Sequence, residues 1–138
     1  MTLSLDTNAL IEIANGRARV RAAFETANQT GEEMVVCVLV AHELRFGARF
    51  SRRESEIRTA EAVLAGLPII PFTAEDANGA TDVRLALERI GRRIGAMDML
   101  IAGQAFSRGW SIVTANVHEF GRIEGLDVID WSADAESA

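Results

Sequence analysis

Met34-Val35-Val36-Cys37-Val38-Leu39-Val40 is an unbroken apolar run, and the residue three places beyond it is Glu43. A run of this kind, rich in Val, is typical of a strand that is covered on both faces, and such strands occur in parallel sheets. Cys37 is the only cysteine of the chain, so we expect a small core residue without a disulfide. The run therefore predicts an α/β fold built around a parallel sheet.

Short strands and helices alternate on both sides of this run. Strands are predicted at residues 3–5, 34–40, 67–72, 110–114 and 126–131, and helices at 8–14, 17–29, 41–50, 54–65, 73–90, 97–108 and 117–120. Pro68 is typical of an edge strand or of a strand start, and Thr73 with Asp76 resembles a capping box. Helices that connect strands in this way give right-handed crossovers and a mainly parallel sheet.

Length and composition indicate one globular domain. The chain has 138 residues, of which 49% are hydrophobic and 25% charged, so we expect a single domain at 1–132 and a polar, disordered tail at 133–138. No apolar stretch reaches the roughly 18 residues that a membrane-spanning helix needs. The first residues carry no basic segment of a signal peptide. We therefore expect a cytoplasmic protein with no membrane partner.

All fourteen basic residues are Arg, although the net charge is −6. The absence of Lys excludes a P-loop, a Schiff base and the Lys-bearing pocket of a phosphorelay receiver. One local excess of Arg comprises Arg45, Arg49, Arg52, Arg53 and Arg58, and a second comprises Arg84, Arg89, Arg92 and Arg93. Solvated helix faces and phosphate-binding surfaces both fit these excesses. The sequence shows no row of aromatic residues on which a single strand would stack.

Four polar residues stand where apolar runs stop: Asp6, Glu43, Asp98 and Asn116. In open parallel sheets the functional site lies beyond the carboxyl ends of the strands, so these side chains are expected to converge on one rim. Carboxylates gathered there repel one another unless a cation neutralises them. An oxygen-rich cluster in a chain poor in Cys and His favours Mg²⁺ or Mn²⁺ over zinc. The pattern predicts a metal-dependent enzyme.

Each of the four residues also has a purely structural interpretation. Asp6 fits a helix N-cap, and Asp98 fits a first-turn acid favoured by the helix dipole. Glu43 alone would be an exposed helix acid, and Asn116 alone a turn residue. Asp98, however, has apolar neighbours on both sides in the sequence, and an unpaired carboxylate in such surroundings is costly. A metal site removes that cost.

Four segments, taken in order, resemble the motifs of the PIN-domain family. They are Leu5-Asp6-Thr7-Asn8-Ala9-Leu10-Ile11, Val40-Ala41-His42-Glu43-Leu44-Arg45-Phe46-Gly47-Ala48, Ile94-Gly95-Ala96-Met97-Asp98-Met99-Leu100-Ile101-Ala102, and Val113-Thr114-Ala115-Asn116 with Glu119-Phe120 and Gly125-Leu126. Within that family the motifs and the chain length are most similar to VapC-like toxins of toxin–antitoxin pairs. The resemblance extends from about residue 3 to residue 131.

The resemblance implies a three-layer α/β/α fold and a Mg²⁺- or Mn²⁺-dependent endoribonuclease with one or two ions. It implies that Asp6 and Asp98 bind metal directly, that Glu43 does so directly or through water, and that Asn116 completes the site. Three further residues are expected to hold the acids or to contact phosphate: Thr7, Asn8 and Thr114. The reaction expected is cleavage of RNA by metal-activated water, with Glu43 or Asp98 orienting or deprotonating that water.

The partners that the resemblance implies are an RNA substrate, a cognate antitoxin and a second copy of the chain. The antitoxin would occupy a groove of the homodimer, and DNA would be bound only through the toxin–antitoxin complex. Two alternatives stay open. One is a PIN-like nuclease that acts on DNA or other single strands without a toxin role, and the other is an RNA-binding or interaction module with a degenerate site.

Overall fold

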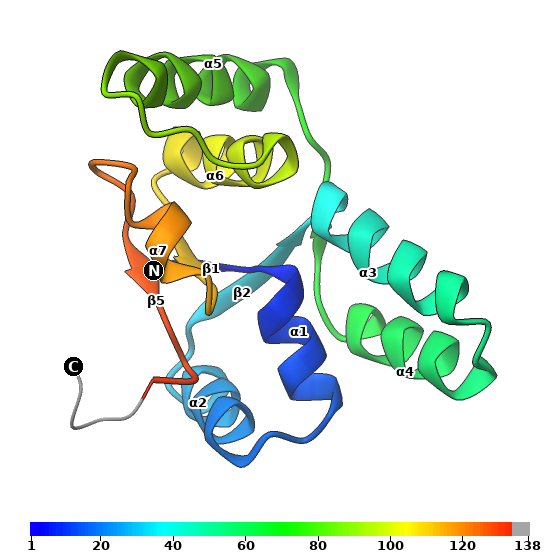
Figure 1. Ribbon diagram of the computed structural model, residues 1–138. Coiled ribbons are helices and arrows are strands. Elements are labelled where there is room, and N and C mark those ends of the chain that lie inside the picture. Colours follow the sequence, from blue (N-terminus) through cyan, green and yellow to red (C-terminus); the bar gives the residue numbers. More distant parts are fainter. Residues whose placement is uncertain (134–138) are drawn as a thin grey trace.

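The computed structural model, which describes residues 1–133, contains a five-stranded parallel sheet (Figure 1). Its strands are β1 (Thr2–Leu5), β2 (Glu33–Cys37), β3 (Ile69–Ile70), β4 (Ser111–Val113) and β5 (Val128–Ile129). They lie in the order β3-β2-β1-β4-β5, and every neighbouring pair is parallel. The predicted parallel sheet is confirmed, and β3, which follows Pro68, is an edge strand as expected.

Helices cover both faces of this sheet. They are α1 (Thr7–Ala14), α2 (Ala18–Gln29), α3 (Val38–Ser51), α4 (Glu54–Ala65), α5 (Ala74–Arg89), α6 (Ala96–Arg108) and α7 (Val117–Phe120). Figure 1 shows α5 and α6 on one side of the sheet and α1 and α2 on the other. α3 and α4 form an antiparallel pair that extends away from the end of β2. The three-layer α/β/α architecture is therefore confirmed.

The apolar run at 34–40 is a strand only as far as Cys37, because α3 begins at Val38. Val40, Ala41 and Leu44 are buried on the inner side of α3. A buried helix face and a buried strand are equally apolar, so the run does not mark the boundary between them. The strands predicted at 67–72 and 126–131 are present but contain two residues each.

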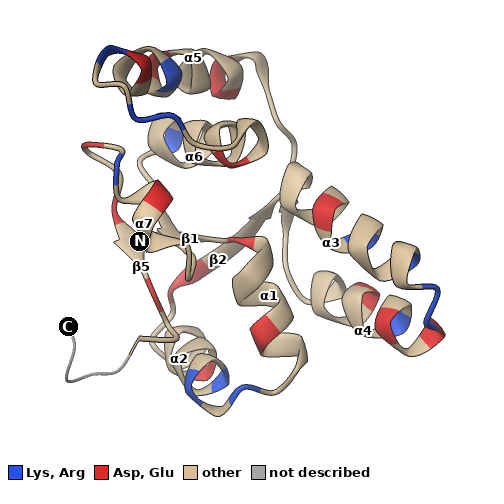
Figure 2. Ribbon diagram, viewed as in Figure 1, with Lys and Arg blue, Asp and Glu red and all other residues tan. Residues whose placement is uncertain are grey.

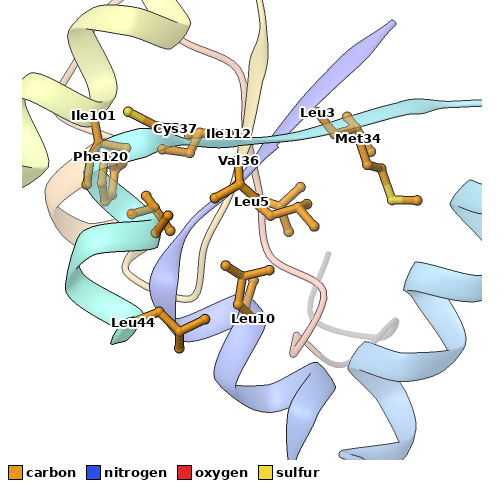
Figure 3. Packing of buried hydrophobic residues seen from close by; sticks show 14 of the residues in the cluster. Leu3, Leu5, Leu10, Met34, Val36, Cys37, Leu44, Ile101, Ile112 and Phe120 are labelled. Carbon is orange, nitrogen blue, oxygen red and sulfur yellow. The ribbon is translucent and has the colours of Figure 1, made fainter. Parts of the chain in front are cut away.

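The core lies on both sides of the central strands (Figure 3). Cys37 of β2 lies beside Ile101 of α6, whereas Val36 points to the opposite side, toward Leu10 of α1. Successive residues of a strand face opposite sides of a sheet, which explains why β2 is apolar at every position from Met34 to Cys37. Cys37 is a buried free cysteine, as predicted.

Small residues allow α5 and α6 to pack very closely. A Cβ atom built on Gly103 of α6 would lie 2.4 Å from Cα of Ala80 on α5. A Cβ atom on Gly79 of α5 would lie 2.7 Å from the carbonyl oxygen of Gly103. The two helix backbones therefore touch along this line, and α6 is held at a fixed distance from α5.

The polar network of Asp76 joins the same two helices. Thr73 and Asp76 form the predicted capping box: Asp76 N donates to Thr73 Oγ1 (3.3 Å), and Thr73 N donates to Asp76 Oδ2 (2.8 Å). Asp76 also accepts hydrogen bonds from Gln104 and Arg108 of α6. This network fixes the orientation of α6, which carries Asp98 in its first turn.

The single domain expected at 1–132 stays a prediction, and the tail expected at 133–138 lies outside the described residues from position 134 onward. None of the helices within residues 1–133 is long and apolar enough to cross a membrane.

Candidate active site

The strand order reverses between β1 and β4, since β2 and β3 lie on one side of β1 and β4 and β5 on the other. The carboxyl ends of two such strands diverge into loops on opposite sides and leave a crevice, where ligands bind in sheets of this type. Asp6 follows β1 directly, and Asn116 lies three residues after the end of β4. The crevice of the fold therefore coincides with the predicted site.

Asp6 occupies the N-cap position of α1, but its side chain makes no capping hydrogen bond. Its Oδ2 atom instead accepts hydrogen bonds from Thr114 Oγ1 (2.9 Å) and Asn8 Nδ2 (3.2 Å). The residue is only 4% exposed. Burial raises the pKa of Asp6, and the negative charge of Glu43 adds to this shift. The carboxylate is thus held by Thr114 and Asn8, and a capping role does not explain it.

Thr114 and Asn8 form a rigid support for Asp6. Thr114 Oγ1 accepts hydrogen bonds from Asn8 Nδ2 (3.0 Å) and from the backbone N–H of Asn116 (3.0 Å) while it donates to Asp6. Asn8 Oδ1 accepts from the N–H of Ala115 at 2.9 Å. Two of the three residues expected to hold the acids therefore contact Asp6 or its partner directly.

Glu43 does not follow its strand directly, as the sequence pattern suggested, because β2 ends at Cys37 and Glu43 lies on α3. It still reaches the site: Thr7 Oγ1, at the start of α1, donates to Glu43 Oε1 at 3.0 Å. Thr7 therefore holds Glu43 in the same way that Thr114 holds Asp6. Both contacts join segments that are far apart in the chain.

Asp98 lies in the first turn of α6 and is partly buried. Burial, the largest cause, and the negative charges of Asp6, Glu119 and Glu43 together raise the pKa of Asp98 to about 6. The Asn116 side chain joins this group, because its Nδ2 atom donates to Glu119 Oε2 (3.1 Å) and to Asp98 Oδ2 (3.4 Å). The structure thus brings all four predicted site residues together.

Glu119 is a fourth acid at the site that the sequence pattern did not single out. It lies on α7, three residues after Asn116, which puts both side chains on the same side of that helical turn. The spacing Asn116-x-x-Glu119 is the signal that identifies it. Figure 2 shows acidic positions of α3, α6 and α7 and of the β1–α1 junction around the same end of the sheet.

The donor set is suited to a hard divalent cation. Carboxylate and amide oxygens dominate it, and these are the ligands that Mg²⁺ and Mn²⁺ prefer. Burial is the largest cause of the raised pKa values of Asp6 and Asp98, and neighbouring negative charges add to it; a bound cation would favour the charged form of both groups. As they stand, no three His, Cys, Asp or Glu side chains within residues 1–133 are grouped closely enough to hold an ion. The fit therefore rests on ligand type and charge.

Comparisons with known proteins agree with this arrangement. The PIN domain model matches residues 3–126. The tRNA(fMet)-specific endonuclease VapC of Shigella flexneri is 37% identical over 130 residues, which cover 93% of this chain and 96% of that protein. The protein of the same name from Salmonella typhimurium is 33% identical, with coverage of 92% and 96%.

The solved structure of VapBC2 from Rickettsia felis, bound to a DNA fragment from its promoter, contains a similar chain. Its TM-score is 0.89 at 28% sequence identity, and the match covers 96% of this chain and 100% of that one. Fold and motif order thus agree over nearly the full length of the described residues. The chain belongs to the PIN domain family, and within that family it belongs with the VapC ribonucleases.

Proposed function

We propose that this protein is a metal-dependent endoribonuclease and the toxin of a toxin–antitoxin pair. The observation that carries the proposal is that Asp6 and Asp98 lie close enough to each other and to Glu43 for their charges to interact. Burial and mutual repulsion raise the pKa values of Asp6 and Asp98 there. Such a cluster costs free energy unless a cation binds it, and the VapC relatives are named as ribonucleases and endonucleases.

In this proposal Asp6 and Asp98 bind Mg²⁺ or Mn²⁺, and Glu43 binds the ion directly or through water. When bound, such an ion neutralises charge on the scissile phosphate and makes a water molecule nucleophilic. Glu43 or Asp98 orients that water and accepts its proton. Asn116 adds no charge; its amide donates to Asp98 and Glu119 and so fixes their positions.

Thr7, Asn8 and Thr114 are positioning residues in this scheme. Their hydroxyl and amide groups hold the Glu43 and Asp6 carboxylates through the contacts described above. Each contact joins two different elements, so the acids keep their places before any ligand arrives. A site that is organised in advance loses less free energy on reaching the transition state.

The toxin role rests on the relatives. Structural neighbours are VapBC complexes, one of them bound to promoter DNA. We infer a cognate antitoxin as partner, a homodimer as the assembly, and contact with DNA only through the complex. The net charge of −6 supports the last point, because a negative protein is repelled by a duplex. A toxin that cleaves cellular RNA acts in the cytoplasm.

Cleavage of total cellular RNA and of tRNA(fMet) by antitoxin-free protein tests the proposal. Reactions with Mg²⁺ or Mn²⁺ are compared with reactions in EDTA, for the unchanged protein and for Asp6→Asn, Asp98→Asn and the control Asp82→Asn. Asp82 is an exposed acid on α5. The proposal expects discrete fragments that need metal, that disappear in the two site variants and that persist in the control.

Other outcomes would contradict it. Fragments that persist in both folded site variants would mean that these residues do not carry the reaction. Equal cleavage of single-stranded DNA and RNA would favour a PIN-like nuclease without a toxin role. No cleavage, together with no effect of Mn²⁺ on the unfolding temperature, would mean a degenerate site.

A further inference from the structure

Three ring side chains form a row on α3, contrary to the expectation that the chain has no such row. The His42 and Phe46 rings are 6.5 Å apart, and the Phe46 and Phe50 rings are 5.7 Å apart and stacked at 24°. Phe46 is 61% exposed and Phe50 is 77% exposed. The sequence hides the row because its members are four residues apart, which brings them together only on a helix.

This row starts beside the candidate active site. Phe46 and Phe50 lie three and seven residues after Glu43 on the same helix, and residues with these spacings share one side of a helix. At 1.5 Å per residue the row extends about 10 Å from Glu43 along the helix axis. A ligand that lies along these rings therefore ends at the acidic cluster.

Positive charge surrounds the outer end of the row. Arg49, Arg52 and Arg53 are exposed, and Figure 2 shows Arg positions on α3 and at its turn into α4. Arg53 pairs with Glu56 at 3.4 Å. The charge of Arg49 helps to lower the pKa of Glu61, and Arg52 forms no salt bridge with any residue in 1–133. The first turn of α4 carries Glu54 and Glu56, so the three Arg residues give this turn a small excess of positive charge in a protein of net charge −6.

Arg52 also has a left-handed backbone conformation, which glycine adopts more readily than arginine. Its φ is 62° in the left-handed region, and it is the single non-glycine residue with positive φ among residues 1–133. Glycine adopts this conformation without strain, whereas other L-residues pay about 1–2 kcal/mol. Arg52 is the C-cap of α3, where a left-handed residue commonly ends a helix, and this places its side chain at the turn into α4.

We propose that Phe46 and Phe50 stack against unpaired bases of the RNA substrate, while Arg49 and Arg52 contact its phosphates. The RNA segment then leads along α3 to Glu43. This inference rests on the proposed function and adds where the substrate lies. Aromatic platforms flanked by Arg are the common means of binding single strands. A second copy of the chain is the competing occupant of this surface, and sedimentation of the Phe variants tests it.

Binding of a short, unstructured, fluorescein-labelled RNA in EDTA tests this inference without any cleavage. Fluorescence anisotropy is measured for the unchanged protein and for Phe46→Ala, Phe50→Ala and the control Ile90→Ala. Ile90 is 60% exposed and follows α5, so it matches Phe46 in exposure. We expect each Phe variant to raise Kd roughly tenfold, since stacking on one base has about that value. The control should leave Kd unchanged.

Two further substitutions separate base stacking from general apolar contact. Phe50→Trp keeps an aromatic face and should retain the affinity, whereas Phe50→Leu keeps apolar area alone and should lose it. Arg49→Ala should reduce the slope of the logarithm of the binding constant against the logarithm of the salt concentration by roughly 0.7, the value expected for one phosphate of a single strand. The same RNA annealed into a duplex should bind more weakly. Its Kd should be the same for the unchanged protein and for the Phe variants.

Three results would overturn the inference. They are no measurable binding by the unchanged protein, equal Kd values for all variants, and an unchanged Kd together with conversion of a dimer to a monomer in sedimentation of the Phe variants. The last would assign the row to a second copy. Because no step needs cleavage, failure of the proposed function would appear in the RNA digests alone, and failure of this inference in the binding data alone.

Discussion

Arg108 of α6 donates two hydrogen bonds, each 2.9 Å long, to Asp76 of α5, and the Asp76 side chain is 1% exposed. The guanidinium group of Arg108 also lies over the Trp110 ring, 5.0 Å from its centroid. Burial raises the pKa of Asp76, but hydrogen bonds from Arg108, Thr73 and Gln104 outweigh it and hold this pKa well below its ordinary value. The pair therefore links stability to pH.

The contribution of the charged Asp76 carboxylate to the free energy of unfolding should be lost in acid. A carboxyl whose folded pKa lies below its unfolded pKa stabilises the protein above the unfolded value, near 4, and this contribution is lost as pH falls from there through the folded value. We expect Asp76→Asn to lower the free energy of unfolding by about 3 kcal/mol at pH 7, since it leaves a buried charge pair broken. Urea unfolding at pH 7, 5 and 3 should show the two proteins converging as the pH falls.

Glu54→Gln is the control for this pH series. Glu54 pairs with Arg58 at 3.7 Å on an exposed helix face, where an ion pair is worth less than about 1 kcal/mol. The free energy of unfolding of the Glu54→Gln protein should follow that of the unchanged protein at every pH. A difference between Asp76→Asn and the unchanged protein that does not shrink in acid would contradict the assignment.

Gly103→Ala and Gly47→Ala should change stability in opposite directions. Alanine stabilises an exposed helix position by about 1 kcal/mol relative to glycine, and a Cβ on Gly47 of α3 meets nothing within 4 Å. At Gly103 the same atom would overlap the backbone of Ala80, so α5 and α6 must separate, at a cost of about 1–3 kcal/mol. Thermal unfolding of both variants gives the test; an unchanged or higher midpoint for Gly103→Ala would contradict the close packing.

Asn116→Asp should weaken the metal-free protein and strengthen its response to metal. The new carboxylate would lie beside Asp98 and Glu119, where Asn116 Nδ2 now donates to both. We expect a loss of about 1 kcal/mol of stability in EDTA from like-charge repulsion and a larger rise of the unfolding midpoint with Mn²⁺ than in the unchanged protein.

Asn116→Ala is the matched control, because it removes the same hydrogen bonds without adding charge. It should not enlarge the effect of Mn²⁺. If Asn116→Asp and Asn116→Ala respond to Mn²⁺ equally, charge at this position is not what limits the binding of the ion.

Arg52→Gly should stabilise the protein. Glycine removes the strain of the left-handed conformation at this turn, although part of the gain is lost because glycine is more flexible in the unfolded chain. We expect a net increase of about 0.5–1 kcal/mol in urea unfolding at low ionic strength, with weaker RNA binding in the same variant. A decrease in stability would mean that the Arg52 side chain contributes more to the fold than its exposure indicates.

The sequence predicts the strands, most helix boundaries and the meeting of Asp6, Asp98 and Asn116, because each of these depends on a local pattern. The prediction fails where a strand passes into a helix without any change in the hydrophobic pattern. At Val38 one apolar run continues from β2 into α3, and helical periodicity begins there without any polar residue to mark it. The length of β3 depends on its neighbour β2, which a single segment does not encode.

The supporting contacts of the site were harder to predict than the acids. Thr114 and Asp6 are 108 positions apart, and only the pairing of β4 with β1 brings the hydroxyl to the carboxylate. Glu119 belongs to the fourth motif and to the helix predicted at 117–120, but its place at the site depends on Asn116, whose side chain also contacts Asp98 of α6, and the sequence does not show that contact. The ring row on α3 is not apparent as a run in the sequence, because His42, Phe46 and Phe50 are four residues apart and meet only on a helix.

The contact between Thr114 and Asp6 also makes the order of the first strand's carboxylate depend on a strand that is synthesised much later. β1 is made first, but its carboxylate gains its partner only when β4, more than one hundred residues later, pairs with it. A nascent chain still attached to the ribosome exit tunnel lacks that strand and therefore lacks an ordered acidic cluster. The position of the Asp6 side chain is thus fixed only after β4 has emerged and paired with β1.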